Sequence, residues 1–188
     1  RQMRYSTAAK DKGNELDLAI LINGIPFITC ELKNEGTGQN IVNGMEQYRN
    51  HRDPNNRMLK SCLVHFVADN NRVMMTTKLC GENTMFLPFN INTDNPIIEG
   101  KYATSYMWED IFQADSLLNI IQDFIKQYIP RKSKTRERVT IFPRYHQLRC
   151  VRRIIADIKE KGNGESYLVQ HSAGSGKSKS IAWLAHQL

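Results

Sequence analysis

The sequence predicts an α/β protein, in which a mixed β-sheet flanked by helices is followed by the beginning of a second α/β domain. Three observations predict this class. Apolar and polar residues alternate on both sides of Asn23-Gly24 over residues 15–33, as in a half-buried β-hairpin. Apolar residues then recur at helical spacing over residues 39–52. Near the end of the chain, residues 166–188 read as a short apolar strand, a loop of small residues and an apolar helix.

The register of the predicted hairpin decides which of its side chains meet. A strict two-residue Asn-Gly loop pairs Ile22 with Ile25 and mixes apolar with polar side chains on both faces. A shift by one residue, through a three-residue loop or a bulge, pairs Ile22 with Pro26 and separates the two faces cleanly. We therefore predict the shifted register.

This register brings acidic side chains together. Asp17 then lies opposite Glu31, and Glu15 lies opposite Lys33, with Cβ atoms roughly 5 Å apart. Two adjacent carboxylates repel each other unless a cation lies between them, and such oxygen ligands suit Mg²⁺. We predict that Asp17 and Glu31 bind Mg²⁺, which polarises a phosphodiester, while Lys33 orients or stabilises the reacting groups. The alternative interpretation is a half-buried hairpin whose charges simply face solvent.

Composition limits the class of protein. Of 188 residues, 40% are apolar and 24% charged, as in a soluble globular protein. No apolar run approaches the roughly 20 residues that span a bilayer. The four cysteines are not spaced as zinc ligands, which favours a reduced, cytoplasmic protein.

The rest of the chain suggests two domains. We predict strands over 62–68, 73–77 and 84–88, a loop over 90–104, an amphipathic helix from Trp108 to Tyr128, and a second helix over 144–161. Residues 131–142 are charged and poor in large apolar side chains, so we predict a linker between domains 1–130 and 143–188. Both domains look truncated.

After residue 130 there are 13 basic and 4 acidic residues. This excess of positive charge favours contact with a polyanion such as DNA, and the alternative is a solvated basic surface without a partner.

The run from His171 to Ser178 resembles a Walker A phosphate loop, because it follows a predicted strand over 166–170 and opens a helix. Gly174 and Gly176 let backbone amides surround phosphate oxygens. We predict that Lys177 reaches the β- and γ-phosphates of ATP and that Ser178 binds its Mg²⁺. His171 stands where the usual pattern has glycine.

A second predicted nucleotide contact lies about thirty residues upstream, at the start of the helix over 144–161. Gln147 can both donate to and accept from the edge of an adenine ring, and Tyr145 can stack on it. We predict that Gln147 contributes to binding the nucleotide.

The order and spacing of several short motifs resemble the N-terminal part of the restriction (R) subunit of type I restriction-modification enzymes. The resemblance runs nearly end to end. Its motifs are Arg1-Gln2, Tyr5-Ser6, Leu16-Asp17, Asn23-Gly24-Ile25-Pro26, Glu31-Leu32-Lys33-Asn34, Gln47-Tyr48-Arg49, Phe86-Leu87-Pro88-Phe89-Asn90, and Tyr167-Leu168-Val169-Gln170 continuing through His171 to Ser178.

The resemblance implies a PD-(D/E)xK endonuclease core followed by the first helix–strand–P-loop–helix unit of a RecA-like, helicase-like motor. It implies Mg²⁺-dependent cleavage of double-stranded DNA, coupled to ATP-dependent translocation, in a complex with methyltransferase and specificity subunits. Catalytic roles carry over to Asp17, Glu31 and Lys33. Many relatives carry a Gln-x-x-x-Tyr helix, whereas here Gln47 and Tyr48 are adjacent and Gly44 precedes Tyr48 by four; we include Gln47 among the predicted catalytic residues.

Two other functions remain open from the sequence. One is a RecB-type nuclease-helicase of DNA repair, and the other is a non-catalytic DNA-binding or assembly module whose acidic cluster is structural. We expect these 188 residues alone not to hydrolyse ATP, because a Walker B acidic residue and an arginine finger are expected beyond Leu188.

Overall fold

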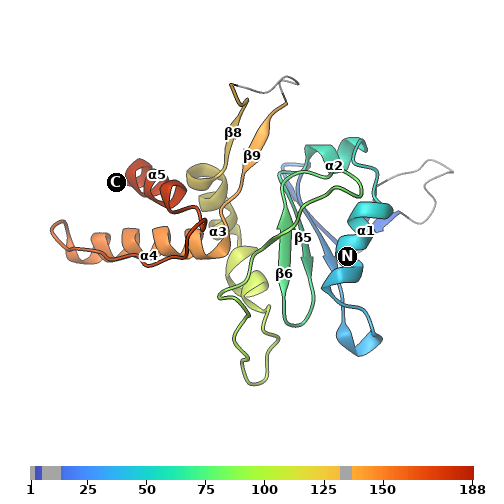
Figure 1. The fold of residues 1–188 in the computed structure, drawn as a ribbon, viewed down its shortest axis with the longest axis horizontal. Helices are drawn as coiled ribbons and strands as arrows, with labels where there is room; N and C mark the ends of the chain where they lie inside the picture. Colours follow the sequence, from blue (N-terminus) through green and yellow to red (C-terminus); the bar gives the residue numbers. More distant parts are fainter. Residues whose placement is uncertain (1–2, 6–13, 132–136) are drawn as a thin grey trace. The chain divides into compact units, whose positions relative to one another are not determined.

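The computed structural model describes residues 3–5, 14–131 and 137–188, which belong to two compact units, Arg1–Met107 and Trp108–Leu188 (Figure 1). The predicted linker over 131–142 does not coincide with this division. Its residues Val139–Ile141 form strand β9, which pairs with β8 at Lys126–Tyr128, so the charged stretch connects two paired strands. The functional assignment of the two domains stays a prediction.

The first unit contains a five-stranded mixed sheet in the order β3-β4-β5-β6-β7. β4 and β5 are parallel, and the other neighbours are antiparallel. The strands are β3 at Leu18–Ile22, β4 at Ile25–Leu32, β5 at Val64–Ala68, β6 at Val73–Thr76 and β7 at Leu87–Pro88. A separate pair joins β1, Met3–Arg4, to β2, Glu15–Leu16.

The β3–β4 hairpin contains both registers that the sequence allows. At the turn, Asn23 and Gly24 have φ of 50° and 79°, as a two-residue hairpin turn requires, and Ile22 pairs with Ile25. The predicted pairing of Ile22 with Pro26 is therefore wrong. A bulge after this turn shifts the ladder by one residue, and from Ile20 to Leu18 the predicted register is found, with Leu18 opposite Cys30.

Helices α1, Ile41–Asn50, and α2, Arg57–Ser61, lie in the connection between the parallel strands β4 and β5 (Figure 1). Asn40 caps α1: its side-chain oxygen accepts from the Val42 amide, and its own backbone amide donates to the side-chain oxygen of Asn43. A short 3₁₀ turn, η2 at Glu35–Thr37, precedes it. The helices pack on one face of the sheet around a buried cluster of Leu16, Ile41, Tyr48, Leu59, Val67 and Leu79.

The second unit is mainly helical. The predicted helix over 108–128 is broken into a π-helical turn η3 at Met107–Ile111, helix α3 at Ala114–Asn119 and a π-helical turn η4 at Ile120–Phe124. It ends before Tyr128, which lies in β8, because residues 126–128 pair with β9. Helix α4, Tyr145–Lys161, packs on α5, Lys177–Gln187, and Trp183 of α5 donates to the Phe124 carbonyl at 2.8 Å.

The predicted strand over 166–170 is not found: these residues belong to no helix or strand, and Leu168 is 94% exposed. A strand needs a neighbour for its backbone groups, and none of the described residues pairs with this stretch. The mixed α/β class, with helices beside a mixed sheet, is confirmed. No helix in the described part of the chain is long and apolar enough to cross a membrane.

Candidate functional site

Asp17 and Glu31, the predicted metal ligands, lie together at the β2–β3 junction and on β4. Asp17 follows β2, and its Oδ2 accepts a hydrogen bond from the Leu32 amide at 2.8 Å, which holds the acidic side chain across from β4. Glu31 lies within β4 and is fully buried. The Asp17 carboxylate is close enough to raise the pKa of Glu31 through its charge and a direct side-chain contact. The shifted register therefore brings the two acids into one place.

Glu31 is also ion-paired with a residue that the sequence did not single out. Oε1 of Glu31 accepts from Arg52 Nε at 3.0 Å and from Arg52 Nη2 at 2.5 Å. Oε2 is buried and makes no hydrogen bond. Burial raises the pKa of Glu31 to about 7; Arg52 opposes this shift and Asp17 adds to it. One carboxylate oxygen is thus satisfied and the other is left open.

Lys33 and Gln47, two further predicted catalytic residues, contact each other in the structure. Lys33 Nζ donates to Gln47 Oε1 at 2.7 Å, which joins the end of β4 to α1. Glu15, predicted opposite Lys33, instead forms an ion pair with Arg4 at 2.6 Å. This difference follows from the pairing of β2 with β1, which places Glu15 opposite Arg4.

Glycine at position 44 lets α1 lie close enough to the sheet for Gln47 to contact Lys33. A Cβ at Gly44 would lie 2.3 Å from Val67 Cγ1 and 3.4 Å from Lys33 Cγ, so only glycine lets α1 approach the sheet this closely. The Gln-x-x-x-Tyr pattern described in the sequence analysis would place glutamine at this position. Here the helix backbone occupies that space, and Gln47, one turn further along, makes the contact with Lys33.

A buried polar network lies next to these residues. Thr29 Oγ1 is 2.6 Å from the Tyr48 hydroxyl and 2.7 Å from His65 Nδ1. Burial lowers the pKa of His65 to about 3, so this ring is neutral. Tyr48 is fully buried, and burial followed by the charge of Glu31 raises its pKa. The sequence reading missed Thr29 and His65, because neither belongs to a motif.

The residues present fit a divalent cation. Glu31 offers a buried oxygen without a hydrogen-bond partner, and the adjacent Asp17 carboxylate is a second hard oxygen ligand. No group of three or more His, Cys, Asp or Glu side chains capable of holding a metal is found within the described ranges. A two-carboxylate set is typical of Mg²⁺, which keeps several waters in its coordination shell.

The phosphate-loop residues form a second candidate site, in the other unit. Gly174 and Gly176 have φ of 72° and 85°, in the left-handed region that favours glycine. Lys177 Nζ donates to the carbonyl oxygens of His171 and Ser172, each at 3.0 Å, so the lysine curls back over its own loop. Ser178 is exposed in the first turn of α5.

Gln147 is only 3% exposed and is fully engaged with protein atoms. Its Oε1 accepts from the Arg144 amide, and its Nε2 donates to the carbonyls of Ser175 and Gly176 at 3.2 and 3.0 Å. His146 Nε2 is also 3.0 Å from the Ser175 carbonyl. The start of α4 therefore supports the phosphate loop, and adenine recognition by Gln147 stays a prediction.

Comparison with known proteins supports the resemblance to type I restriction enzymes that the motifs indicated. A family model described as "Type I restriction enzyme R protein N terminus" matches residues 1–84. A Methanocaldococcus jannaschii protein described as "Putative type I restriction enzyme MjaVIIIP endonuclease subunit" is 26% identical over 204 aligned positions, which cover 96% of this chain. The chain spans 18% of the length of that relative. The resemblance drawn from the motifs is thereby confirmed over residues 1–84, which match the family model of type I restriction enzyme R protein N termini.

Proposed function

We propose that the first unit is the Mg²⁺-dependent endonuclease domain of a type I restriction enzyme, acting on double-stranded DNA as a PD-(D/E)xK nuclease. The observation that carries this proposal is the placement of Asp17 beside Glu31, with Lys33 one residue beyond the end of the strand that holds Glu31. Glu31 contacts Arg52, just beyond α1, and Lys33 contacts Gln47 of α1, so both side chains lie on the side of the sheet that α1 covers. The family of residues 1–84 supports the same conclusion.

Each residue has a defined role in this proposal. Asp17, held by the Leu32 amide, and Glu31, held by Arg52, would bind the cation. When bound, Mg²⁺ polarises the scissile phosphodiester and lowers the pKa of a water. Lys33 supplies a positive charge where negative charge develops on the phosphate, and Gln47 orients its ammonium group.

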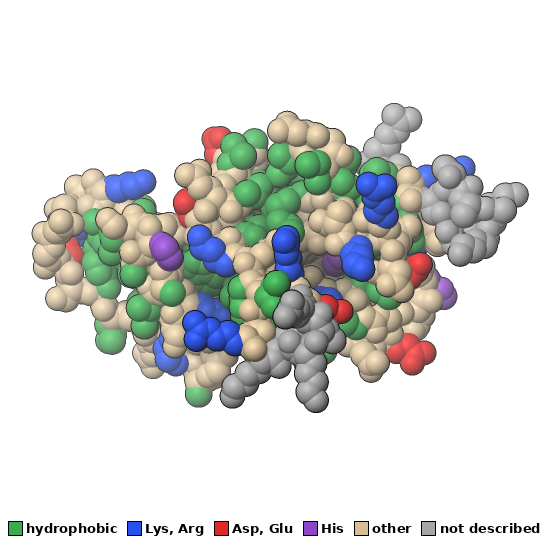
Figure 2. Space-filling model, turned by 90° about the horizontal axis from the view of Figure 1, so that it is seen from above, with side chains coloured by type: hydrophobic (Ala, Val, Ile, Leu, Met, Phe, Trp, Pro, Cys, Tyr) green, Lys and Arg blue, Asp and Glu red, His purple; other side chains and the backbone are tan. Residues whose placement is uncertain are grey.

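The basic composition after residue 130 supports contact with DNA. Residues 131–188 include 13 basic and 4 acidic residues. Figure 2 shows Lys and Arg side chains of the molecule spread over the viewed surface among other residue types. Such charges contribute sequence-independent affinity for phosphates. Recognition of a sequence and methylation would belong to the specificity and methyltransferase subunits of the complex.

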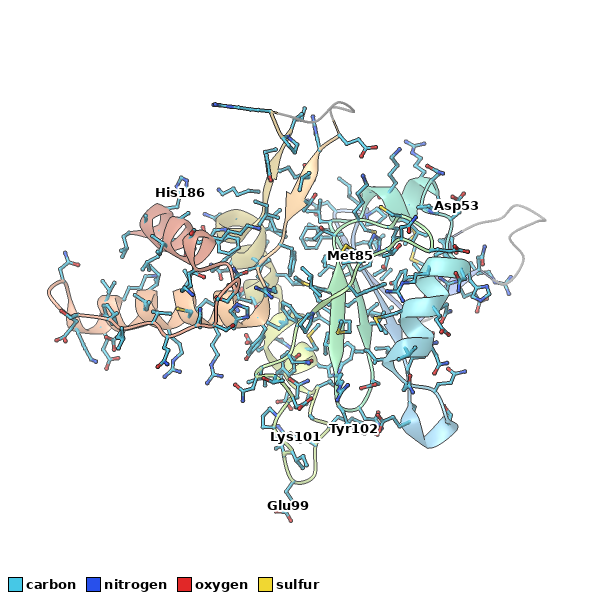
Figure 3. The ribbon with its side chains drawn as sticks, viewed as in Figure 1. Asp53, Met85, Glu99, Lys101, Tyr102 and His186 are labelled. Carbon is cyan, nitrogen blue, oxygen red and sulfur yellow. The ribbon has the colours of Figure 1, made fainter. Side chains whose placement is uncertain are left out.

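The deciding experiment is DNA nicking by the full-length protein assembled with methyltransferase and specificity subunits, with Mg²⁺ and ATP. Asp17→Asn keeps the shape of the side chain but removes its charge, and we expect nicking to fall to background while ATP turnover persists. Glu99→Gln is the matched control, because Glu99 is exposed in a loop and projects into solvent (Figure 3). Nicking by Asp17→Asn at the wild-type rate would reject the proposal.

We further propose that Lys177 and Ser178 bind the phosphates and Mg²⁺ of ATP that drives DNA translocation, as in a helicase-like RecA domain. The left-handed glycines and the support of the loop by Gln147 favour a backbone held ready for an anion. Lys177→Ala is expected to abolish ATP-dependent translocation by the full-length complex without weakening cation binding at Asp17 and Glu31. Unchanged translocation would contradict this assignment.

A non-catalytic assembly module is the second candidate, and the Glu31–Arg52 ion pair is the observation that favours it. An acid already neutralised by a buried arginine is what a purely structural carboxylate shows. The same Asp17→Asn experiment separates the two functions. A structural module predicts that the complex assembles less well, whereas the nuclease predicts normal assembly without nicking.

A further inference from the structure

Arg52 is a buried charge just beyond the end of α1, and its surroundings hold it in a single position. The residue is only 5% exposed. Its guanidinium donates to Glu31 Oε1 through two nitrogens, donates to the Glu15 carbonyl at 2.6 Å, and lies over the Tyr5 ring, 5.5 Å from its centroid. These four contacts come from three residues that are far from Arg52 in the sequence.

The way in which Arg52 contacts Glu31 is unusual in one respect. Arginine commonly binds a carboxylate with a fork, one nitrogen to each oxygen. Here both nitrogens converge on Oε1, while Oε2 stays buried without a hydrogen-bond partner. A buried oxygen without a partner costs free energy, so its persistence needs a reason.

Asp17 supplies that reason. Its carboxylate lies close to Glu31, and two carboxylates are both acceptors, so neither can satisfy the other without a proton or a cation between them. Asp17 itself is fixed by the Leu32 amide. Both acids are therefore held by donors at one oxygen of each, Oδ2 of Asp17 and Oε1 of Glu31.

We propose that Arg52 is a positioning residue that holds the Glu31 carboxylate by Oε1 and so presents Oε2 as a ligand for the divalent cation shared with Asp17. This inference rests on the proposed function. It predicts that Arg52 stays on Oε1 when the cation binds. A merely charge-balancing arginine would compete with the cation, and its removal would tighten cation binding; a positioning arginine has the opposite effect.

The test measures Mn²⁺ binding to the full-length protein by electron paramagnetic resonance, without nucleotide. The difference between wild type and Asp17→Asn defines binding at this site. Partners that orient metal ligands typically contribute about 10- to 100-fold in metal affinity. We therefore expect Arg52→Met to bind Mn²⁺ more weakly by about that factor, and Arg52→Lys, which keeps one cationic donor, to recover part of the loss.

Arg49→Met is the matched control. Arg49 lies in the last turn of α1, three residues before Arg52; it donates to the Thr84 carbonyl at 3.1 Å and lies over the Phe86 ring, and neither contact is to Glu31. Its substitution should leave Mn²⁺ affinity unchanged. Circular dichroism verifies that each variant folds. If Arg52→Met does not fold, the Mn²⁺ affinity of Arg52→Lys alone tests the proposal. Wild-type Mn²⁺ affinity in Arg52→Lys would then overturn it.

A structure of the wild-type protein soaked with Mn²⁺ tests the same inference without substitution. The expected result is a cation on Glu31 Oε2 with both Arg52 nitrogens still on Oε1. Displacement of Arg52 from Glu31 by the cation, or tighter Mn²⁺ binding in Arg52→Met, overturns the inference. If wild type and Asp17→Asn bind Mn²⁺ equally and the soaked structure shows no cation there, the proposed function itself fails, which distinguishes the two failures.

Discussion

The carboxylate site of the first unit and the phosphate loop of the second differ in what positions their functional groups. Glu31 is fully buried, and its position depends on Arg52, twenty-one residues away, and on the sheet around it. Lys177 is exposed and donates to carbonyl oxygens of its own loop, five and six residues away. The acidic side chain of the first site is held by long-range packing, whereas the lysine of the second is held by its own loop, which Gln147 supports from α4.

This difference teaches where each site is vulnerable. A group held by buried charges leaves an uncompensated charge when its partner is removed, so function and stability fall together. A group on an exposed loop can be removed with little effect on folding. Substitutions at the first site should therefore lower the free energy of unfolding much more than substitutions in the phosphate loop.

The largest expected effect is that of Glu31→Ala. It leaves Arg52 buried without its carboxylate, and breaking such a pair costs about 3–5 kcal/mol. Glu31→Gln keeps an acceptor for Arg52 and should cost less. Lys177→Met, in the exposed loop, should change the free energy of unfolding by less than about 0.5 kcal/mol. Denaturant unfolding measures all three, and a Glu31→Ala loss no larger than that of Lys177→Met would contradict the comparison.

Acid should reduce the contribution of His65 to the stability of the first unit. The pKa of His65 is about 3 in the folded chain because of burial, against the ordinary value of 6.5, so at intermediate pH the unfolded chain binds a proton that the folded chain does not. The contribution of His65 to the free energy of unfolding is constant above pH 6.5 and falls between pH 6.5 and 3, by up to about 1.4 kcal/mol per pH unit.

His65→Asn removes this titration but keeps a polar side chain beside Thr29. The difference in unfolding free energy between wild type and His65→Asn, measured from pH 7 to pH 4, should therefore narrow as the pH falls. A difference that stays constant over this range would show that His65 is not buried in its neutral form.

The smallest effect is expected in the phosphate loop, where two glycines form a matched pair. Gly174 and Gly176 both have positive φ, so alanine at either position costs about 1 kcal/mol of backbone strain. At Gly176 a Cβ would also lie 2.4 Å from Gln147 Nε2, whereas at Gly174 it meets nothing within 4 Å. Thermal unfolding should show a larger loss for Gly176→Ala, and equal losses would mean that Gln147 does not support the loop.

The sequence anticipated most of the local structure around the first site. Asn23-Gly24 specified the turn, because both residues accept positive φ, and the alternation of apolar residues specified the register beyond it. The sequence did not predict where the register shifts. The structure keeps the two-residue turn and has a bulge in the strand, whereas the alternation of apolar and polar residues was compatible with either a longer loop or a bulge.

Tertiary contacts that no local pattern encodes explain the other misses. Nothing in the residues around Arg52 distinguishes a buried arginine from an exposed one, although a glutamate in the middle of an apolar strand implies a charged partner somewhere. The stretch 166–170 has the composition of a strand, but composition does not supply the neighbouring backbone that a strand needs.

Order along the chain was enough to indicate the resemblance to type I restriction enzymes and the mixed α/β class, and to nominate residues such as Asp17, Glu31 and Lys177 for the two candidate sites, because motif spacing, alternation and glycine placement are properties of the chain itself. Only the folded structure showed that Arg52 holds one oxygen of Glu31, that Gly44 lets Gln47 reach Lys33, and that Gln147 supports the phosphate loop. These contacts join residues at least fourteen positions apart, and their existence depends on how strands and helices pack.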